Sequence, residues 1–77
     1  MKKRLAREHE IKSEIRFRYN RPGRAPLADI VVVHREMSDG NWSARPDPEL
    51  TDGDDKRAFI AAVYEVRRIF DLDGDGN

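Results

Sequence analysis

Three aspartates near the end of the chain have a spacing that suits a divalent cation. Asp71, Asp73 and Asp75 follow Phe70 at alternate positions, and Gly76 comes directly after them. A tight turn aims carboxylates at this spacing toward one cation that prefers oxygen ligands, and the glycine permits the bend. Calcium is therefore the one cofactor that the sequence suggests, and three carboxylates predict only weak binding.

The segment Asp71–Asn77 resembles the first half of an EF-hand calcium loop. Aspartate stands at loop positions one, three and five, glycine stands at six, and an aromatic residue ends the preceding helix. In that family the loop continues to a bidentate glutamate at position twelve and a second helix, whereas Asn77 corresponds to position seven. The resemblance implies weak calcium binding, and the competing interpretation is an acidic tail after a helix that ends near Gly74.

No other stretch has the residues and spacing of a known catalytic motif. Cysteine is absent, which excludes disulfides and thiolate zinc sites, and His9 and His34 share no metal-ligand spacing. The serines lie outside any nucleophile-elbow sequence, and neither a phosphate-binding glycine loop nor an H-E-x-x-H pattern occurs. We therefore expect a protein that is not an enzyme.

The composition indicates one small domain whose charges are unevenly distributed. The 77 residues carry 15 basic and 15 acidic side chains; residues 1–24 hold nine basic and three acidic, and residues 47–77 hold four and nine. Apolar runs such as Ile30–Val33 are much too short to cross a membrane, and no export signal follows the basic start. We expect a cytoplasmic protein with no membrane partner, for which a homodimer is one option because so small a core needs support.

The acidic second half predicts a partner with a basic surface. Proteins that handle nucleic acids present such surfaces, and a small acidic protein can occupy them by imitating phosphate. The most concrete expectation is an inhibitor or adaptor of such machinery, similar in character to the accessory proteins of phages and mobile elements, including anti-CRISPR inhibitors. The residues predicted to bind this partner are Asp47, Glu49, Asp52, Asp54 and Asp55.

One long amphipathic helix is expected to organise the fold, over Thr51–Phe70. Phe59, Val63, Val66 and Phe70 recur at helical spacing, acidic residues occupy the first turn and arginines the last. A helix with so broad an apolar face has to pack on a sheet or on another helix.

Three extended segments are expected to form that sheet. Apolar and charged residues alternate over Ile11–Asn20, β-branched residues fill Asp29–Met37, and Asp-Gly precedes a short strand over Trp42–Arg45. The prediction is an α+β domain, a three-stranded antiparallel meander against one C-terminal helix, with residues 2–10 as a basic arm or a short N-terminal helix. The predicted core joins the helix residues above to Ile15, Phe17, Tyr19, Val31, Val33 and Trp42.

The basic first half offers an alternative function, the binding of nucleic acid. In a first strand over residues 11–20, three cations would share the exposed face and two more would continue it into the loop. These five residues are Lys12, Arg16, Arg18, Arg21 and Arg24. The expected order of elements is similar in outline to the sheet-reading DNA-binding domains of ethylene-response factors and transposon integrases, and, with an N-terminal helix, to a double-stranded-RNA-binding domain. The RNA-binding family has lysines at the start of its last helix, where this chain has Asp52, Asp54 and Asp55.

Overall fold

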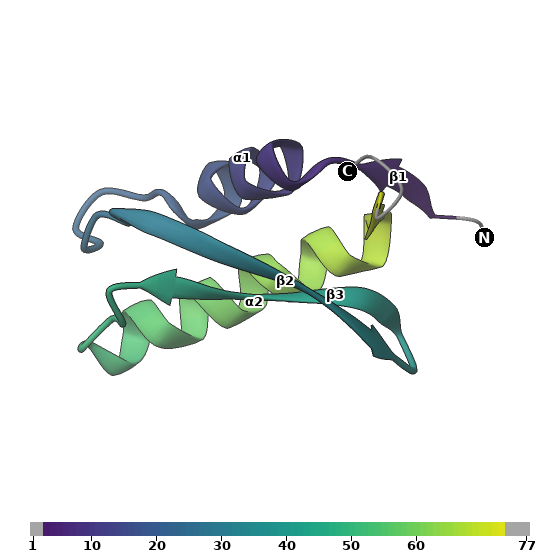
Figure 1. The fold of residues 1–77 in the computed structure, drawn as a ribbon. Helices are drawn as coiled ribbons and strands as arrows, with labels where there is room; N and C mark the ends of the chain where they lie inside the picture. The colour runs from purple at the N-terminus through teal and green to yellow at the C-terminus, as the bar shows by residue number, and fades with distance from the viewer. Residues whose placement is uncertain (1–2, 74–77) are drawn as a thin grey trace.

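The computed structural model describes residues 3–73 and contains two helices and two small sheets (Figure 1). Two of the strands form an antiparallel hairpin, and the other two, near the two ends of the chain, form a parallel pair. In chain order the elements are β1 (Arg4–Ala6), α1 (Glu8–Tyr19), β2 (Asp29–Met37), β3 (Gly40–Asp47), α2 (Gly53–Ile69) and β4 (Phe70–Leu72).

The chain is α+β, but the predicted three-stranded meander with a single C-terminal helix is wrong. Residues 11–20, expected to be the first strand, belong to α1 instead. Ile11, Ile15 and Tyr19 are completely buried and lie four residues apart, so they form one helical stripe, while Phe17 lies on the opposite side with 78% of its surface exposed. A strand would have put all four side chains on one face.

Local interactions explain why this segment prefers a helix. The backbone N–H of Arg7 donates to the side chain of Glu10, which satisfies one of the free donors at the helix start. Ion pairs between Glu8 and Lys12 and between Glu14 and Arg18 link residues one turn apart. Such pairs stabilise a helix and have no counterpart along one strand.

The chain ends of the described region pair with each other. β1 runs parallel to β4, with Leu5 opposite Asp71, and the backbone N–H of Asp73 continues the pairing by donating to the carbonyl of Ala6 at 2.9 Å. Residues 4–6 are therefore a strand, where the sequence predicted a basic arm or a short N-terminal helix. Nothing in a three-residue run of mixed character indicates a partner so distant in sequence.

The hairpin follows the prediction closely. β2 spans Asp29–Met37 as expected, and β3 is longer than expected at both ends. The chain reverses at Ser38 and Asp39, and Gly40, expected in the turn, is the first residue of β3 and pairs with Met37. α2 also matches the predicted helix, although Asp52 rather than Thr51 is its N-cap, accepting hydrogen bonds from the backbone N–H groups of Asp54 and Asp55.

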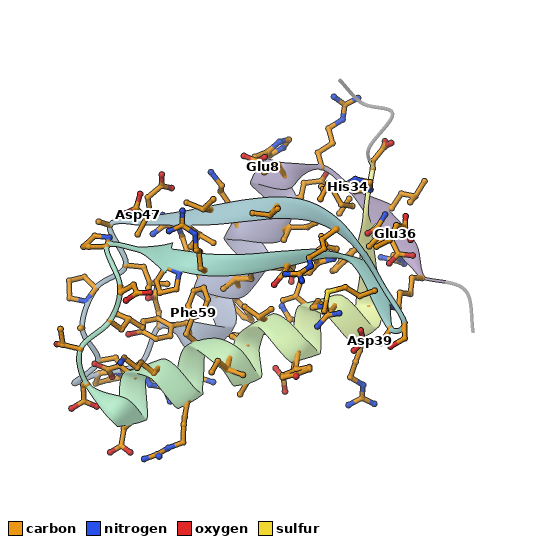
Figure 2. The ribbon with its side chains drawn as sticks, turned by 60° about the horizontal axis from the view of Figure 1, so that its bottom comes forward. Glu8, His34, Glu36, Asp39, Asp47 and Phe59 are labelled. Carbon is orange, nitrogen blue, oxygen red and sulfur yellow. The ribbon has the colours of Figure 1, made fainter. Side chains whose placement is uncertain are left out.

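The core lies between the two helices and one face of the hairpin (Figure 2). Trp42 is completely buried and donates from Nε1 to the carbonyl of Phe70 at 3.0 Å, and Tyr19 packs edge-on against Phe59. Of the predicted core residues, Phe59, Val63 and Val66 of α2 are buried and Phe70, in β4, is half-buried. Phe17 and Val33 are exposed, and Val31 is only half-buried. Both errors on β2 arise because its outer face has no helix over it.

Candidate protein-binding site

A hollow of about 220 Å³ lies at the end of the molecule where β3 leads into α2. Leu50 and Phe59 are buried beneath it, and Ile60 stands beside them with 53% of its surface exposed. A carboxylate and an ammonium group complete the lining. The whole set is Pro46, Glu49, Leu50, Lys56, Phe59 and Ile60.

The loop between β3 and α2 gives this hollow its shape. The peptide bond between Asp47 and Pro48 is cis, and Leu50 turns inward to join the core while Asp47 and Glu49 point to solvent. Figure 2 shows Asp47 at the end of the sheet and Phe59 between the sheet and α2. An apolar floor is therefore placed beside carboxylates that the loop holds outward.

The five predicted acidic residues have different surroundings. The carboxylates of Asp47 and Glu49 make no hydrogen bond or ion pair with any residue of the described range 3–73, and both residues are exposed. Asp54 is also exposed and pairs with Arg57 on the next turn of α2. These three can face a partner.

The other two acidic residues hold the fold together. The carboxylate of Asp52 caps α2, as described above, and that of Asp55 is buried, with 8% of the residue exposed. Asp55 Oδ2 accepts a hydrogen bond from the backbone N–H of Ala25 at 3.3 Å, which attaches the loop after α1 to the start of α2. Their negative charges contribute to the acidic end, but their carboxylate groups already accept hydrogen bonds from the backbone of this chain.

Tyr19 lies under the same loop. Its hydroxyl donates to the carbonyl of Ala25 at 2.8 Å, and the Arg24 guanidinium stacks over its ring. Burial, and secondarily the negative charge of Asp55, raises the pKa of Tyr19 above its usual value of 10.0. The phenol therefore remains neutral at physiological pH and serves as a structural donor.

The five predicted nucleic-acid-binding residues lie on α1 and the loop after it instead of on a strand, and each side chain makes at least one contact within the chain. Arg16 donates to the carbonyl of Leu27, and Arg24 donates to that of Tyr19. The other contacts are those of Lys12 with Glu8 and Asp29, of Arg18 with Glu14 and Glu65, and of Arg21 with the carbonyl of Asn20.

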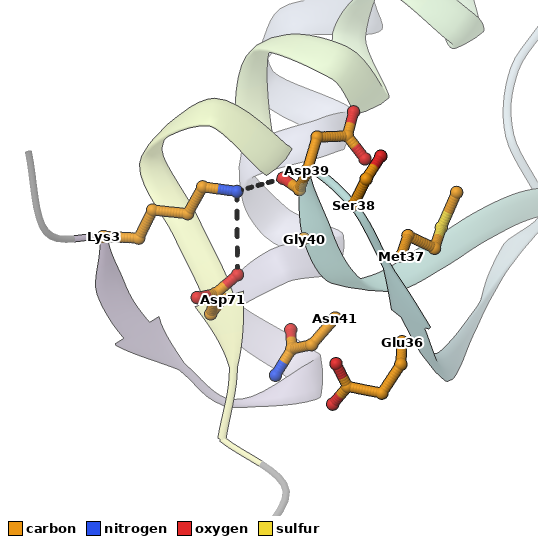
Figure 3. A pocket seen from close by; sticks show the side chains of 8 residues that line it. All are labelled: Lys3, Glu36, Met37, Ser38, Asp39, Gly40, Asn41 and Asp71. Carbon is orange, nitrogen blue, oxygen red and sulfur yellow. Dashed lines mark hydrogen bonds and ion pairs between the residues drawn. The ribbon is translucent and has the colours of Figure 1, made fainter.

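A second hollow, of about 370 Å³, lies at the opposite end, beneath the hairpin turn (Figure 3). Lys3 reaches across it to Asp71, with Nζ 3.7 Å from Oδ1, and donates to the backbone carbonyl of Asp39. Arg67, buried to 6% exposure, pairs there with the Asp39 carboxylate. Opposite charges from Lys3 just before β1, from β4, from α2 and from the turn neutralise one another, so this hollow is a junction between elements.

The predicted calcium loop lies only partly within the described residues. Asp71 is in β4, where its backbone pairs with β1, and Asp75 lies outside the described range. Within residues 3–73 no group of three or more His, Cys, Asp or Glu side chains could hold a metal ion. A strand at residues 70–72 also replaces the turn that an EF-hand loop would begin there.

The residues that sequence reasoning missed are the apolar ones of the hollow beside the acidic loop. Leu50 and Ile60 are ordinary members of a loop and a helix in the sequence, and only the path of residues 46–52 brings them together. In the described part of the chain neither helix is both long and apolar enough to cross a membrane. No family model, curated protein or solved structure matches the chain.

Proposed function

We propose that this chain is a small, non-enzymatic binding protein whose acidic end takes a basic segment of a partner protein. The observation that carries the proposal is the hollow of about 220 Å³ at the start of α2, because apolar side chains line it together with the unpaired carboxylate of Glu49, and Asp47 belongs to the same loop. Interface centres of this kind combine an apolar anchor with a charged rim.

The charges around the hollow favour a basic partner. Asp47 and Glu49 are unpaired at its edge within the described range, and Asp52 and Asp54 add negative charge from the first turn of α2. Lys56 and Arg57 are the nearby cations, and Arg57 is already paired with Asp54. The balance is acidic, and a charged rim of one sign mainly raises the association rate and selects partners of the opposite sign.

The size of the hollow defines what the partner must contain. A volume of about 220 Å³ accommodates one large apolar side chain, such as leucine or phenylalanine, rather than a ligand of drug size. The matching segment therefore has one apolar residue flanked by lysines or arginines. Basic segments of this kind are common on nucleic-acid-binding proteins, so an inhibitor or adaptor of nucleic-acid machinery is the concrete form of this function. The contacts that the basic residues of α1 make within the chain give no comparable reason to favour nucleic acid itself.

A peptide titration tests the proposal. The probe is a fluorescently labelled peptide with a central leucine and two arginines or lysines on each side, followed by fluorescence anisotropy. We expect saturable binding that weakens when the leucine is replaced by glycine and weakens again at high salt. Equal binding of the leucine and glycine peptides would show that the hollow is not used, and no binding of either would refute the proposed function.

The walls of the hollow provide a second test. Ile60→Ser removes an exposed apolar wall without touching the core, and Ile69→Ser makes the same change at an exposed position near the other end of α2. Ile60→Ser should weaken peptide binding, and Ile69→Ser should leave it unchanged. Equal losses in the two variants would count against the hollow as the binding site.

A further inference from the structure

One edge of the hairpin is open for another strand. In the antiparallel register Ile30 lies opposite Pro46, Val32 opposite Ala44 and His34 opposite Trp42. Proline has no N–H, so the Ile30–Pro46 pair cannot exchange two hydrogen bonds and must be a non-hydrogen-bonded pair. Because the two kinds of pair alternate, Ile30, Val32 and His34 direct their N–H and C=O groups away from β3.

The outer edge of β3 is less suited to pairing. Pro46 removes a donor from it, and the side chain of Asn41 already exchanges two hydrogen bonds with the backbone of Leu72 in β4, at 2.9 and 2.8 Å. Proline on an edge and cover by another element both prevent strand addition. β2 is thus the edge of this hairpin that can accept a further strand.

Two backbone donors on β2 remain available. The N–H of Ile30 is satisfied by the side chain of Asp29 at 2.8 Å, which leaves those of Val32 and His34. No backbone hydrogen bond joins either group to another element of residues 3–73. On the outer face of β2, Val31 is half-buried and Val33 is 46% exposed, and Arg45 and Ser43 of β3 lie opposite them.

We propose that a second copy of this chain occupies this edge, so that the two β2 strands pair antiparallel about Val32 and two hairpins form one four-stranded sheet. In this register Val32 lies opposite its own counterpart and Ile30 opposite His34 of the second copy. Val31 of each copy then lies opposite Val33 of the other copy. The two Val31–Val33 pairs place four valines in one apolar stripe across the outer face.

Charge complementarity argues for a second copy in this register. β2 pairs regularly with β3 from Asp29 to His34 and is irregular between His34 and Met37. Asp29 comes to lie beside Arg35 of the second copy, the first residue after the regular part, at both ends of the new strand pair, and opposite charges at such neighbouring positions are stabilising. Arg35 is exposed and makes no ion pair within the described range. Asp29 pairs with Lys12 at 3.7 Å and still has 58% of its side chain exposed. A shift by one residue would pair residues whose backbone groups face the new partner with residues whose backbone groups face β3. A shift by two residues would put Val31 opposite Arg35 in one direction and Asp29 opposite Val33 in the other. The edge therefore complements itself best in a single register.

Cysteine cross-linking tests both the interface and its register, because the chain has no cysteine of its own. Non-hydrogen-bonded pairs bring Cα atoms to about 4.5 Å, within the range of a disulfide. A mixture of the single variants Val31→Cys and Val33→Cys should form a disulfide-linked dimer under mild oxidation, and neither variant should do so alone. Efficient cross-linking of Val33→Cys alone would overturn the register.

The mass in solution tests the association itself. Sedimentation velocity should show a dimer whose population grows with concentration. Arg35→Glu places like charges opposite each other twice and should shift it to monomer, whereas Arg45→Glu, the same change at an exposed position of β3 away from the new edge, should not. A monomer at millimolar concentration with no cross-linked product would refute the proposal. Peptide binding at the acidic end is measured separately, so either proposal can fail without the other.

Discussion

The carboxylate of Asp55 accepts a hydrogen bond from the backbone N–H of Ala25, 30 residues earlier in the chain. This contact attaches the loop between α1 and β2 to the first turn of α2. It also separates the acidic residues of this end into two groups, since Asp52 and Asp55 stabilise the fold and Asp47, Glu49 and Asp54 face solvent. A charge-reversal experiment that includes Asp52 and Asp55 would therefore destabilise the fold as well as change the charge of the binding surface.

Replacing Asp55 should destabilise the protein more than replacing its neighbour. Asp55→Ala leaves the N–H of Ala25 without its acceptor, so we expect a loss of about 1–3 kcal/mol in the free energy of unfolding. Asp54→Ala, at an exposed position of the same turn, should cost below about 1 kcal/mol. Urea unfolding followed by the fluorescence of Trp42 measures both. Equal losses would contradict the structural role assigned to Asp55.

Because residues 8–19 form a helix, substitutions of Ile15 and Phe17 should have different effects on stability. In a strand both side chains would lie on the same face, and the two substitutions would have similar effects. Ile15 is completely buried and Phe17 is 78% exposed. Ile15→Ala should therefore lower the free energy of unfolding by about 2–5 kcal/mol. Phe17→Ala should change it by less than about 0.5 kcal/mol, as surface substitutions usually do. A large loss on replacing Phe17 would favour the strand instead.

The pair between Arg67 and Asp39 connects the last turn of α2 to the hairpin turn. Arg67 is buried to 6% exposure, and its Nε has no protein partner within the described range. The carboxylate of Asp39 is therefore the main group that balances the buried positive charge of Arg67. Asp39→Ala should destabilise the fold by about 1–3 kcal/mol, because it leaves a buried cation poorly paired. The exposed Asp54–Arg57 pair is the matched control, and its removal should cost much less. The same urea titration compares the two, and similar costs would contradict this account.

The raised pKa of Tyr19 predicts a loss of stability at alkaline pH. Its pKa in the folded protein is raised above 10.0 by burial and by Asp55, so the folded state holds the phenol proton more tightly than the unfolded chain does. The stabilising contribution is complete below pH 10 and is lost as the pH rises from there through the folded pKa. Tyr19→Phe lacks this proton, so its stability should fall less steeply over the same range. Parallel slopes for the two proteins, from unfolding curves at several pH values, would rule out this role.

The sequence predicts the hairpin and α2 well because their signals are local. Asp39 and Gly40 are strong turn formers between two β-branched or aromatic segments, and α2 shows helical spacing with suitable charges at both ends. α1 was harder to predict. Ile11, Ile15 and Tyr19 fit a period of two and also a spacing of four, and only the Glu8–Lys12 and Glu14–Arg18 spacings favour the helix.

The rest of the fold depends on contacts that no local pattern encodes. The pairing of Leu5 with Asp71 joins opposite ends of the chain, and the inward turn of Asp55 requires the loop at Ala25 to lie over it. For the candidate site, Asp47 and Glu49 are exposed, and their role in binding a partner stays a prediction. The apolar hollow beside them was not predicted, because Leu50 and Ile60 meet only after residues 46–52 have folded back on α2.

The most direct test of the proposed function compares two identical charge reversals in the anisotropy titration with the basic, leucine-containing peptide. Glu49→Lys lies in the lining of the acidic hollow, and Glu36→Lys lies at the hairpin turn at the opposite end; both side chains are exposed. Glu49→Lys should weaken binding by about tenfold, the equivalent of roughly 1.4 kcal/mol, and Glu36→Lys should leave the affinity unchanged. Equal effects of the two reversals would contradict the assignment of the partner site to the acidic end.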